Sequence, residues 1–465
     1  MKRKTDAANS AMKSLRSDYL SALSPGERAG VRASVAQTIG KLHIILLLVV
    51  LFSYSPAFAE TLLLTGATVH TVSGETITNG QVLLRDGKIS AVGKSVPATD
   101  AKTISLEGLH LYPGMIALNT DLGLVEIDAV RSTVDVREAG DYTPDVYSWL
   151  AVNPDSELIP VARANGISHF EPVPSGAVVA GQSGLLATDG WTTEQMVTKK
   201  SIALHVYWPG AGLDTTPKEK SRNPAKWKSL EDQDKDRREK LRELDDFFAE
   251  AKAYAKARKG TNVFNIVPAW EAMLPVVSGE TPVIIHADDV RQIRAAVSWA
   301  ATNGVKMILA GGLDAWRVAD MLATNNIPVV FSHTFTLPQR ETDGYAVNYA
   351  APGVLSKAGV KVAFTGGGAS LVKNMPYAAA QAVAFGLSSN EALKSLTLYP
   401  AQMAGMGERL GSIETGKNAT LFAADGDILD IRSNVKHIWI AGKEVSLENR
   451  HTRLYGKYKN RPKSP

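Results

Sequence analysis

Short apolar runs alternate with helical segments through the middle of this 465-residue chain. Three of the runs begin at Pro282, Val305 and Pro328, so they recur every 23 residues, and helical stretches such as Asp288–Asn303 separate them. This period suits βα units in a parallel sheet. Eight such units form a barrel of about 250 residues. The sequence therefore predicts an α/β fold, a TIM-type (β/α)8 barrel over residues 113–405.

Strand patterns flank this middle region on both sides. Asp86-Gly87 separates two runs of alternating apolar and polar residues, which is a strong hairpin signal. Far along the chain, Val435–Ile440 has the same strand-like composition. Two strand-rich ends around a long middle predict one small composite β-sandwich domain, formed by residues 60–112 together with residues 406–446.

A charged insertion interrupts the middle region at residues 215–260. Within it, apolar residues at helical spacing predict a surface amphipathic helix over residues 229–258. The apolar stripe consists of Leu241, Leu244, Phe248, Ala251 and Ala255. The favoured interpretation gives this helix no function of its own. Residues 447–465 form a basic tail, with six Lys or Arg between Arg450 and Lys463.

Residues 1–59 have the order of a secretory signal. Lys41 precedes an apolar run, Ile44–Phe52, and the small-residue site Ala57-Phe58-Ala59 follows it. The run is shorter than the roughly 20 residues that a membrane span needs. This favours a signal peptide with a long basic front over the alternative, an N-terminal membrane anchor. We therefore expect an exported protein, periplasmic or secreted, with no stable membrane span after cleavage.

Composition excludes several classes of protein. The chain has no Cys, which rules out disulfides, Cys-based zinc sites, iron–sulfur clusters and thiol nucleophiles. The net charge of +4 comes from residues 1–59, which carry eight Lys or Arg against three Asp or Glu. The rest of the chain is close to neutral, so its charge gives no support for nucleic-acid binding.

Two motifs flank the predicted barrel. Leu111–Ile116 resembles the segment that opens the barrel in the amidohydrolase superfamily, and Gly411–Ala419, after Leu398–Ala401, resembles the closing motif of that family. Val178–Gly184 is similar to a glycine-containing stretch of the imidazolonepropionase-like branch. The resemblance covers roughly residues 61–446, and the opening and closing motifs together also explain a β-domain built from both ends.

The resemblance implies one or two divalent metals, which lower the pKa of a bound water and polarise the scissile carbonyl. It also implies a set of ligands: a His pair on strand 1, often a carboxylated Lys on strand 4, a His on strands 5 and 6, and an Asp on strand 8. The residues at these positions are, in order, Asn119 and Asp121, His205, His286, Gly311 and Gly367. His286 keeps the usual ligand and Gly367 leaves no strand-8 base, so we expect a degenerate active site.

Three His and one Asp remain where barrel strands should end, the face that carries active sites in such barrels. His286, with His205, His333 and Asp121, predicts at most one divalent metal, with Zn²⁺ favoured, or none. Asp121 and His286 are also the predicted catalytic residues. The alternative is that these His side chains cap strands or form hydrogen bonds in a polar cleft without a metal.

Two further features have alternative interpretations. Gly366–Gly368 follows the last barrel strand, where backbone amides with Lys373 could cradle an anion. The favoured interpretation is a loop without a binding role, whose sequence is free to vary because it carries no metal-ligand Asp. Trp208, Trp270 and Trp316 lie near the predicted strand ends, where they could shape an apolar pocket. Packing in the core is the favoured interpretation for at least two of them.

The resulting hypothesis is a hydrolase that breaks a non-peptide or cyclic C–N amide bond in a small-molecule substrate. It would use a mononuclear metal site with fewer ligands than the family usually has. The alternative is a catalytically inactive relative that binds a small molecule or a partner subunit at the barrel mouth. A homo- or hetero-oligomer is compatible with both hypotheses. The family resemblance alone does not decide between them, because one barrel fold hosts many functions.

Overall fold

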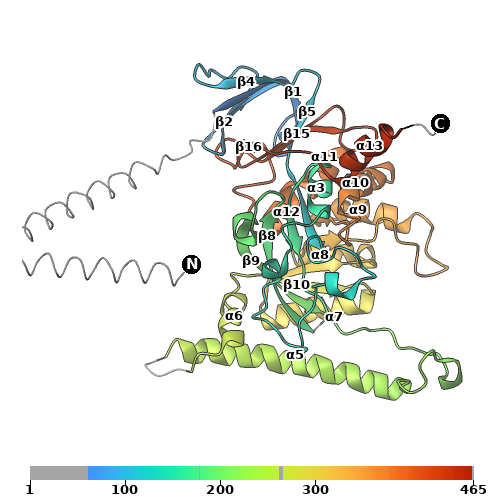
Figure 1. The fold of residues 1–465 in the computed structure, drawn as a ribbon. Helices are drawn as coiled ribbons and strands as arrows, with labels where there is room; N and C mark the ends of the chain where they lie inside the picture. The colour runs from blue at the N-terminus through green and yellow to red at the C-terminus, as the bar shows by residue number, and fades with distance from the viewer. Residues whose placement is uncertain (1–60, 177, 261–264, 463–465) are drawn as a thin grey trace, which may run out of the picture. The chain divides into compact units, whose positions relative to one another are not determined.

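The computed structural model describes residues 61–176, 178–260 and 265–462. The predicted export signal, residues 1–59, lies outside these ranges. The described strands form two eight-stranded sheets, named sheet A and sheet B here (Figure 1). None of the helices in these ranges combines the length and the apolar character that a membrane-spanning segment needs.

Sheet B is the predicted barrel, and its strands follow the order β13-β12-β11-β10-β9-β8-β7-β6. Their bounds are β6 (Met115–Thr120), β7 (Ile167–Pro172), β8 (Val179–Ala187), β9 (Val197–Tyr207), β10 (Val283–Ala287), β11 (Met307–Gly311), β12 (Val329–Phe331) and β13 (Val362–Phe364). Hydrogen bonds bring the first strand to the last. Thr365 Oγ1 donates to the Asn119 carbonyl at 2.9 Å, and Thr120 Oγ1 donates to the Gly367 carbonyl at 2.8 Å. The barrel is therefore nearly closed, and the predicted fold class is confirmed.

One strand of sheet B departs from the expected parallel order. β8 pairs antiparallel with both β7 and β9, whereas the other pairs in the sheet are parallel. A parallel crossover needs a dozen or more residues, and only residues 173–178 join β7 to β8. The short connection therefore forces a hairpin-like reversal. The carboxyl ends of β6, β7 and β9–β13 still meet at one end, which we call the barrel mouth.

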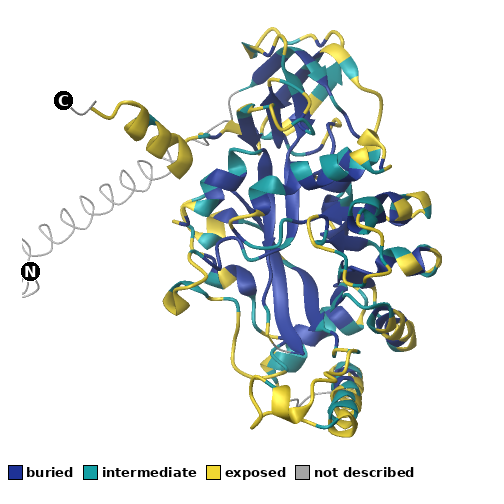
Figure 2. Ribbon diagram, turned by 90° about the vertical axis from the view of Figure 1, so that its right-hand side faces the viewer, coloured by how far each residue is buried: buried dark blue, intermediate teal, exposed yellow. Residues whose placement is uncertain are grey.

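The two-residue period of the strands separates inward from outward side chains. Ile284 and Ile308 belong to the cluster inside the barrel, which residues 401–410 complete. Ile285 and Leu309 belong to the cluster between the strands and the surrounding helices. Figure 2 shows the long barrel strands as almost entirely buried, with exposed residues concentrated in the helices and loops around them.

The helices lie mainly around sheet B. Their bounds are α3 (Leu158–Arg163), α4 (Thr193–Met196), α5 (Leu230–Arg258), α6 (Pro268–Val277), α7 (Val290–Asn303), α8 (Ala319–Thr324), α9 (Val347–Lys357), α10 (Met375–Ala384), α11 (Ser389–Leu396), α12 (Leu398–Met403) and α13 (Arg450–Lys459). The predicted surface helix is α5, which begins after the N-cap Ser229. Its residues Leu244, Phe248 and Ala251 are fully buried against the outer face of the barrel, and most of the others are exposed. The amphipathic prediction is confirmed.

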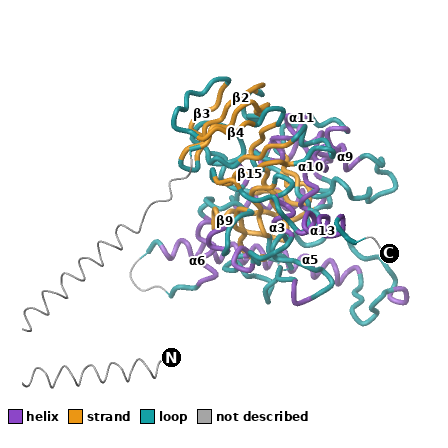
Figure 3. Tube along the Cα trace, turned by 45° about the horizontal axis from the view of Figure 1, so that its top comes forward, coloured by secondary structure: helices purple, strands orange, loops and turns teal. Residues whose placement is uncertain are grey.

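Sheet A joins both ends of the described chain. Its order is β16-β15-β14-β5-β1-β2-β3, and β4 also pairs with β1. Its strands are β1 (Leu62–Val69), β2 (Ile77–Arg85), β3 (Lys88–Gly93), β4 (Lys102–Ser105), β5 (His110–Pro113), β14 (Leu421–Ala424), β15 (Val435–Ile440) and β16 (Lys443–Glu444). β14 lies between β15 and β5, with Leu421 opposite Pro113. Figure 3 shows β2, β3 and β4 gathered apart from the helices. The composite β-domain predicted from the two ends is confirmed.

Gly114 connects the two sheets, since it lies between β5 and β6 in the opening motif. A Cβ at this position would lie 2.6 Å from Ser168 Cβ and 2.8 Å from Thr420 Cγ2, both closer than carbon atoms pack. We expect Gly114→Ala to lower the free energy of unfolding by about 1–3 kcal/mol, because a tightly packed site accepts no extra methyl group. Gly210→Ala is the control, since nothing lies within 4 Å of its added Cβ. Equal unfolding midpoints in denaturant for the two variants would contradict the steric argument.

Candidate active site at the barrel mouth

A cavity of about 430 Å³ opens at the barrel mouth. Six strands deliver residues to it at or just beyond their carboxyl ends, namely Asn119, Val173, Tyr207, His286, Ser332 and Gly367. Four valines form its apolar part, Val125, Val134, Val136 and Val173. A cavity of this size accommodates a small molecule and little more.

Another cavity, of about 530 Å³, lies at the opposite end of the barrel. It is lined by residues at the amino ends of β10 and β11, such as Pro282 and Met307, and its charged residues are Lys199, Glu280 and Lys306. Active sites in barrels of this kind lie at the carboxyl ends of the strands. The mouth cavity, with its carboxylates and imidazole, is therefore the candidate active site.

Asp121 lines the mouth cavity directly after β6. Burial is the main reason that the pKa of its carboxyl group is raised above the usual value, and nearby Asp128 raises it further. The backbone N–H of Ala369 donates to the carboxyl group and opposes this shift. One oxygen, Oδ1, is buried without a hydrogen-bond partner among the described residues. A carboxyl group with a raised pKa and an unpaired oxygen beside a cavity has the properties of a proton donor.

The glycine-rich loop after β13 supplies this contact with Asp121. The Ala369 N–H of this loop donates to the Asp121 carboxyl group rather than to a free anion. Lys373 Nζ donates to the Ser370 carbonyl of the same loop at 2.8 Å. The loop therefore orients Asp121 in the described structure. A Cβ on Gly367 would meet nothing within 4 Å, so the missing strand-8 side chain leaves open space beside the cavity.

His286 also lines the cavity, and its ring forms a hydrogen bond with that of His205. The separation between His286 Nε2 and His205 Nδ1 is 3.0 Å. The phenol ring of Tyr207 stacks on His286 with centroids 4.0 Å apart. Burial, followed by the neighbouring His205, holds the pKa of His286 well below 6.5. His286 is therefore neutral at pH 7 and has one nitrogen that can accept a proton.

Two further buried polar side chains lie beneath this His pair, and neither was predicted from the sequence. Glu171 in β7 and Ser183 in β8 have no exposed surface. His205 Nε2 lies 2.8 Å from Ser183 Oγ and 3.3 Å from Glu171 Oε1. The signal that could have identified Glu171 is a carboxylate at an inward position of an apolar strand, two residues after His169.

His333 faces away from this group and pairs with a different carboxylate. Its Nε2 lies 2.7 Å from Asp288 Oδ1, in the loop after β10. A Cβ on Gly311 would lie only 2.5 Å from the same Asp288 oxygen. The glycine at the strand-6 ligand position therefore leaves room for the Asp288 carboxylate, which binds His333.

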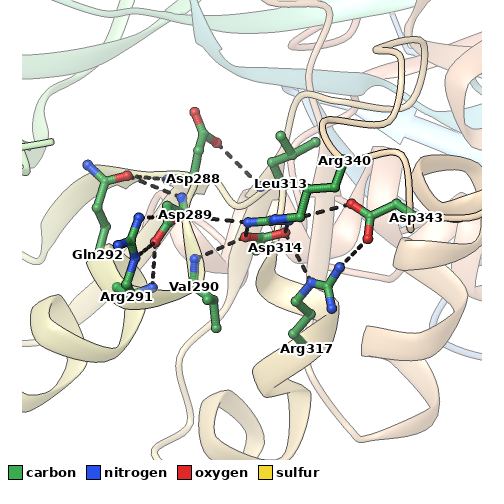
Figure 4. A network of polar contacts seen from close by, with 10 residues as sticks. All are labelled: Asp288, Asp289, Val290, Arg291, Gln292, Leu313, Asp314, Arg317, Arg340 and Asp343. Carbon is green, nitrogen blue, oxygen red and sulfur yellow. Dashed lines mark hydrogen bonds and ion pairs between the residues drawn. The ribbon is translucent and has the colours of Figure 1, made fainter. Parts of the chain in front are cut away.

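An ion-pair network fixes the loops beside Asp288 (Figure 4). Arg340 donates to both oxygens of Asp314, at 2.7 and 2.6 Å, and Arg317 links Asp314 to Asp343. Burial raises the pKa of Asp314. The hydrogen bonds from Arg340 and the Val290 backbone lower the pKa by more than burial raises it, so the net shift is downward. The network attaches the loop after β12, which carries Ser332 and His333, to the loops after β10 and β11.

The remaining predicted features have structural roles in the described chain. Trp208 is buried in the cluster outside the barrel, and Trp270 and Trp316 pack against that cluster. None of the three is among the residues that line the mouth cavity. Core packing, the favoured interpretation, therefore holds for these three residues.

The donor atoms at the mouth fit a divalent metal poorly. Both ring nitrogens of His205 are already hydrogen bonded, and His333 is paired with Asp288. The structure brings His286 together with His205, and places Asp121 on the same cavity, but it does not bring His333 to them. Within residues 61–176, 178–260 and 265–462, no group of three or more His, Asp or Glu could hold a metal ion.

A barrel of this order, with a candidate site at the carboxyl ends of its strands, places the chain in the class of α/β-barrel proteins. Residues 278–445 match the model of the amidohydrolase family. A 64-residue segment is 39% identical to the amidohydrolase tasK of Hapsidospora irregularis. That segment is 14% of this chain and only 6% of the relative.

Solved structures extend the likeness to most of the chain. An amidohydrolase from Thermotoga maritima MSB8 has a TM-score of 0.71 at 25% identity, and the match covers 83% of this chain and 99% of that one. A prolidase in complex with N-methylphosphonate-L-proline has a TM-score of 0.51 at 17% identity, covering 83% and 99%. A Xaa-Pro dipeptidase with bound methionine has a TM-score of 0.51 at 15% identity, covering 83% and 100%. The last two likenesses concern the fold alone.

Proposed function

We propose that this protein hydrolyses a small, non-peptide amide or cyclic amide at the barrel mouth. The observation that carries the proposal is one cavity lined by both Asp121 and His286, on the fold of the amidohydrolase superfamily. The environments of the two groups shift their pKa values in opposite directions, since that of Asp121 is raised and that of His286 is lowered. Such a pair is suited to opposite proton-transfer roles.

The roles follow from these protonation preferences. His286, neutral at pH 7, takes a proton from the attacking water as its oxygen bonds to the amide carbon. Asp121, which holds a proton more readily than an ordinary carboxyl group, gives that proton to the leaving nitrogen as the C–N bond breaks. The products are a carboxylic acid and an amine, which remain joined in one molecule when the substrate is cyclic.

Charge narrows the class of substrate. The cavity contains Asp121 and Asp128, and the described residues that line it include neither Lys nor Arg. A substrate with a free carboxylate would meet the Asp128 side chain and no cationic partner, which is unfavourable in a partly enclosed site. We therefore propose a neutral or cationic amide, held against Val125, Val134, Val136 and Val173 on the apolar part of the cavity.

The test compares neutral, cationic and carboxylate-bearing amides and lactams as substrates of the purified full chain. We expect Asp121→Asn to lower kcat by about 10²–10⁴-fold, because the amide cannot donate the proton as an acid. Asp100→Asn is the control, since Asp100 pairs with Arg85 on the exposed surface of the β-domain. Release of amine or carboxylate is the measurement.

One outcome would favour the alternative function. If no amide is hydrolysed, while a neutral small molecule raises the midpoint of thermal unfolding and Asp121→Asn removes that effect, the mouth is a binding site without catalysis. The imidazolonepropionase-like branch and export to the periplasm or medium stay predictions from Val178–Gly184 and residues 1–59.

A further inference from the structure

Four buried or half-buried polar side chains form a continuous row across four adjacent barrel strands. Glu171, Ser183, His205 and His286 come from β7, β8, β9 and β10 in that order. Inward neighbours two residues away, such as Leu185, Ala203 and Ile284, belong to the cluster inside the barrel. The strand period therefore points all four side chains inward at similar height along the barrel. Glu171 is the fully buried end of the row, and His286 is the end that lines the cavity.

The hydrogen-bond partners assign a proton to each position in the row. Ser183 has one hydroxyl proton, which it donates to Glu171 Oε1 at 2.5 Å. Ser183 Oγ must then accept from His205, so His205 carries its proton on Nε2. With a neutral His205 ring, its Nδ1 is then an acceptor, and His286 Nε2 donates to it across 3.0 Å. The Nδ1 atom of His286 is left with its lone pair, on the one ring of the two that lines the cavity.

The charged end of the row is held by the backbone. Glu171 Oε2 accepts the Asn119 N–H at 2.9 Å, so both carboxylate oxygens have partners. Asn119 adopts a left-handed backbone with φ 53°, which turns its N–H inward. Asn tolerates this conformation better than most residues. A fully buried carboxylate without such donors would be strongly unfavourable.

We infer that the row Glu171–Ser183–His205, rather than a divalent metal, orients His286 so that its Nδ1 faces the cavity as the base. The inference rests on the proposed hydrolysis. Glu171, Ser183 and His205 are positioning residues, since they act through His286. The donor set supports the inference, because His205 Nδ1 has no lone pair to spare for an ion and the strand-6 and strand-8 ligand positions are Gly311 and Gly367.

The first experiment measures metal and activity together. The full chain is dialysed against EDTA, and parallel samples receive Zn²⁺ or Mn²⁺ alone. We expect far less than one metal per chain by elemental analysis and an unchanged kcat in all samples. One tightly bound metal per chain, whose removal abolishes hydrolysis and whose return restores it, would overturn the inference.

The second experiment observes the ring protons directly. In ¹⁵N NMR spectra, we expect His205 and His286 to be neutral, each protonated on Nε2. Glu171→Gln should change the tautomer signals of His205 and His286 and lower kcat by roughly 10²–10⁴-fold with little change in KM. Ser183→Ala should have a smaller effect, because the 3.3 Å approach of His205 to Glu171 remains. Thermal unfolding of both variants checks that they fold.

The two proposals can fail separately. Unchanged His205 and His286 signals in folded Glu171→Gln would overturn the row as the device that orients His286. The expected signals together with no hydrolysis of any amide would retain the row and contradict the proposed function instead.

Discussion

Removal of residues 411–465 is expected to abolish folding of the β-domain and to give insoluble or molten protein. The truncation deletes β14, which pairs with β5 on one side and β15 on the other. It would expose the edge of β5 and the buried rings and aliphatic side chains that face β14, including Leu111 and Tyr112. An unpaired apolar edge of this kind promotes aggregation.

The matched control removes residues 448–465. This deletion takes away α13, which has no buried residue, and leaves every strand of sheet A in place. We expect the shorter truncation to remain soluble and to unfold cooperatively, as judged by size-exclusion chromatography and near-ultraviolet circular dichroism. A 411–465 truncation that behaves in the same way would show that the N-terminal strands fold without their C-terminal partners.

Phe422→Ala is expected to be among the most damaging single substitutions, at about 3–5 kcal/mol of unfolding free energy. Phe422 in β14 is fully buried and stacks on Tyr112 of β5 with centroids 5.2 Å apart. It also lies in the hydrophobic cluster that includes barrel residues such as Phe170. Its removal would leave a cavity between sheet A and the barrel, which adds to the lost burial of the ring.

Phe335→Ala is the control for the same chemical change at an exposed position. The Phe335 side chain is 60% exposed, so its truncation should alter stability by no more than about 0.5 kcal/mol. Urea unfolding of both variants, followed by fluorescence, measures the difference. Comparable losses for the two substitutions would mean that the cluster around Phe422 does not connect the β-domain to the barrel energetically.

Much of the fold could be predicted from local pattern. Runs beginning at Val305 and Pro328 became β11 and β12, and the apolar stripe around Leu244 and Phe248 became α5. These elements depend on periodicity, which neighbouring residues encode. The direction of β8 was not predicted, because it depends on the length of the connection from β7 and on which strands lie beside it.

The candidate site was only partly predictable, for a related reason. Position at the end of a strand was sufficient to select Asp121, His205 and His286, and the structure places all three at or beneath the barrel mouth. Position was not sufficient for His333, whose partner Asp288 occupies space that Gly311 leaves free. That pairing depends on residues from three different strands and loops.

The sequence by itself determined the barrel period, the contribution of both ends to one β-domain, and the absence of thiol chemistry. Each of these follows from residue identity, or from spacing within a few tens of residues. Only the tertiary structure decided which polar groups meet. Glu171 and His205 are 34 positions apart in the sequence, yet their side chains approach to 3.3 Å, because sheet order and strand register bring them together on the inward face. Hydrogen bonds between such distant residues have no local signature, so their existence depends on the assembled barrel.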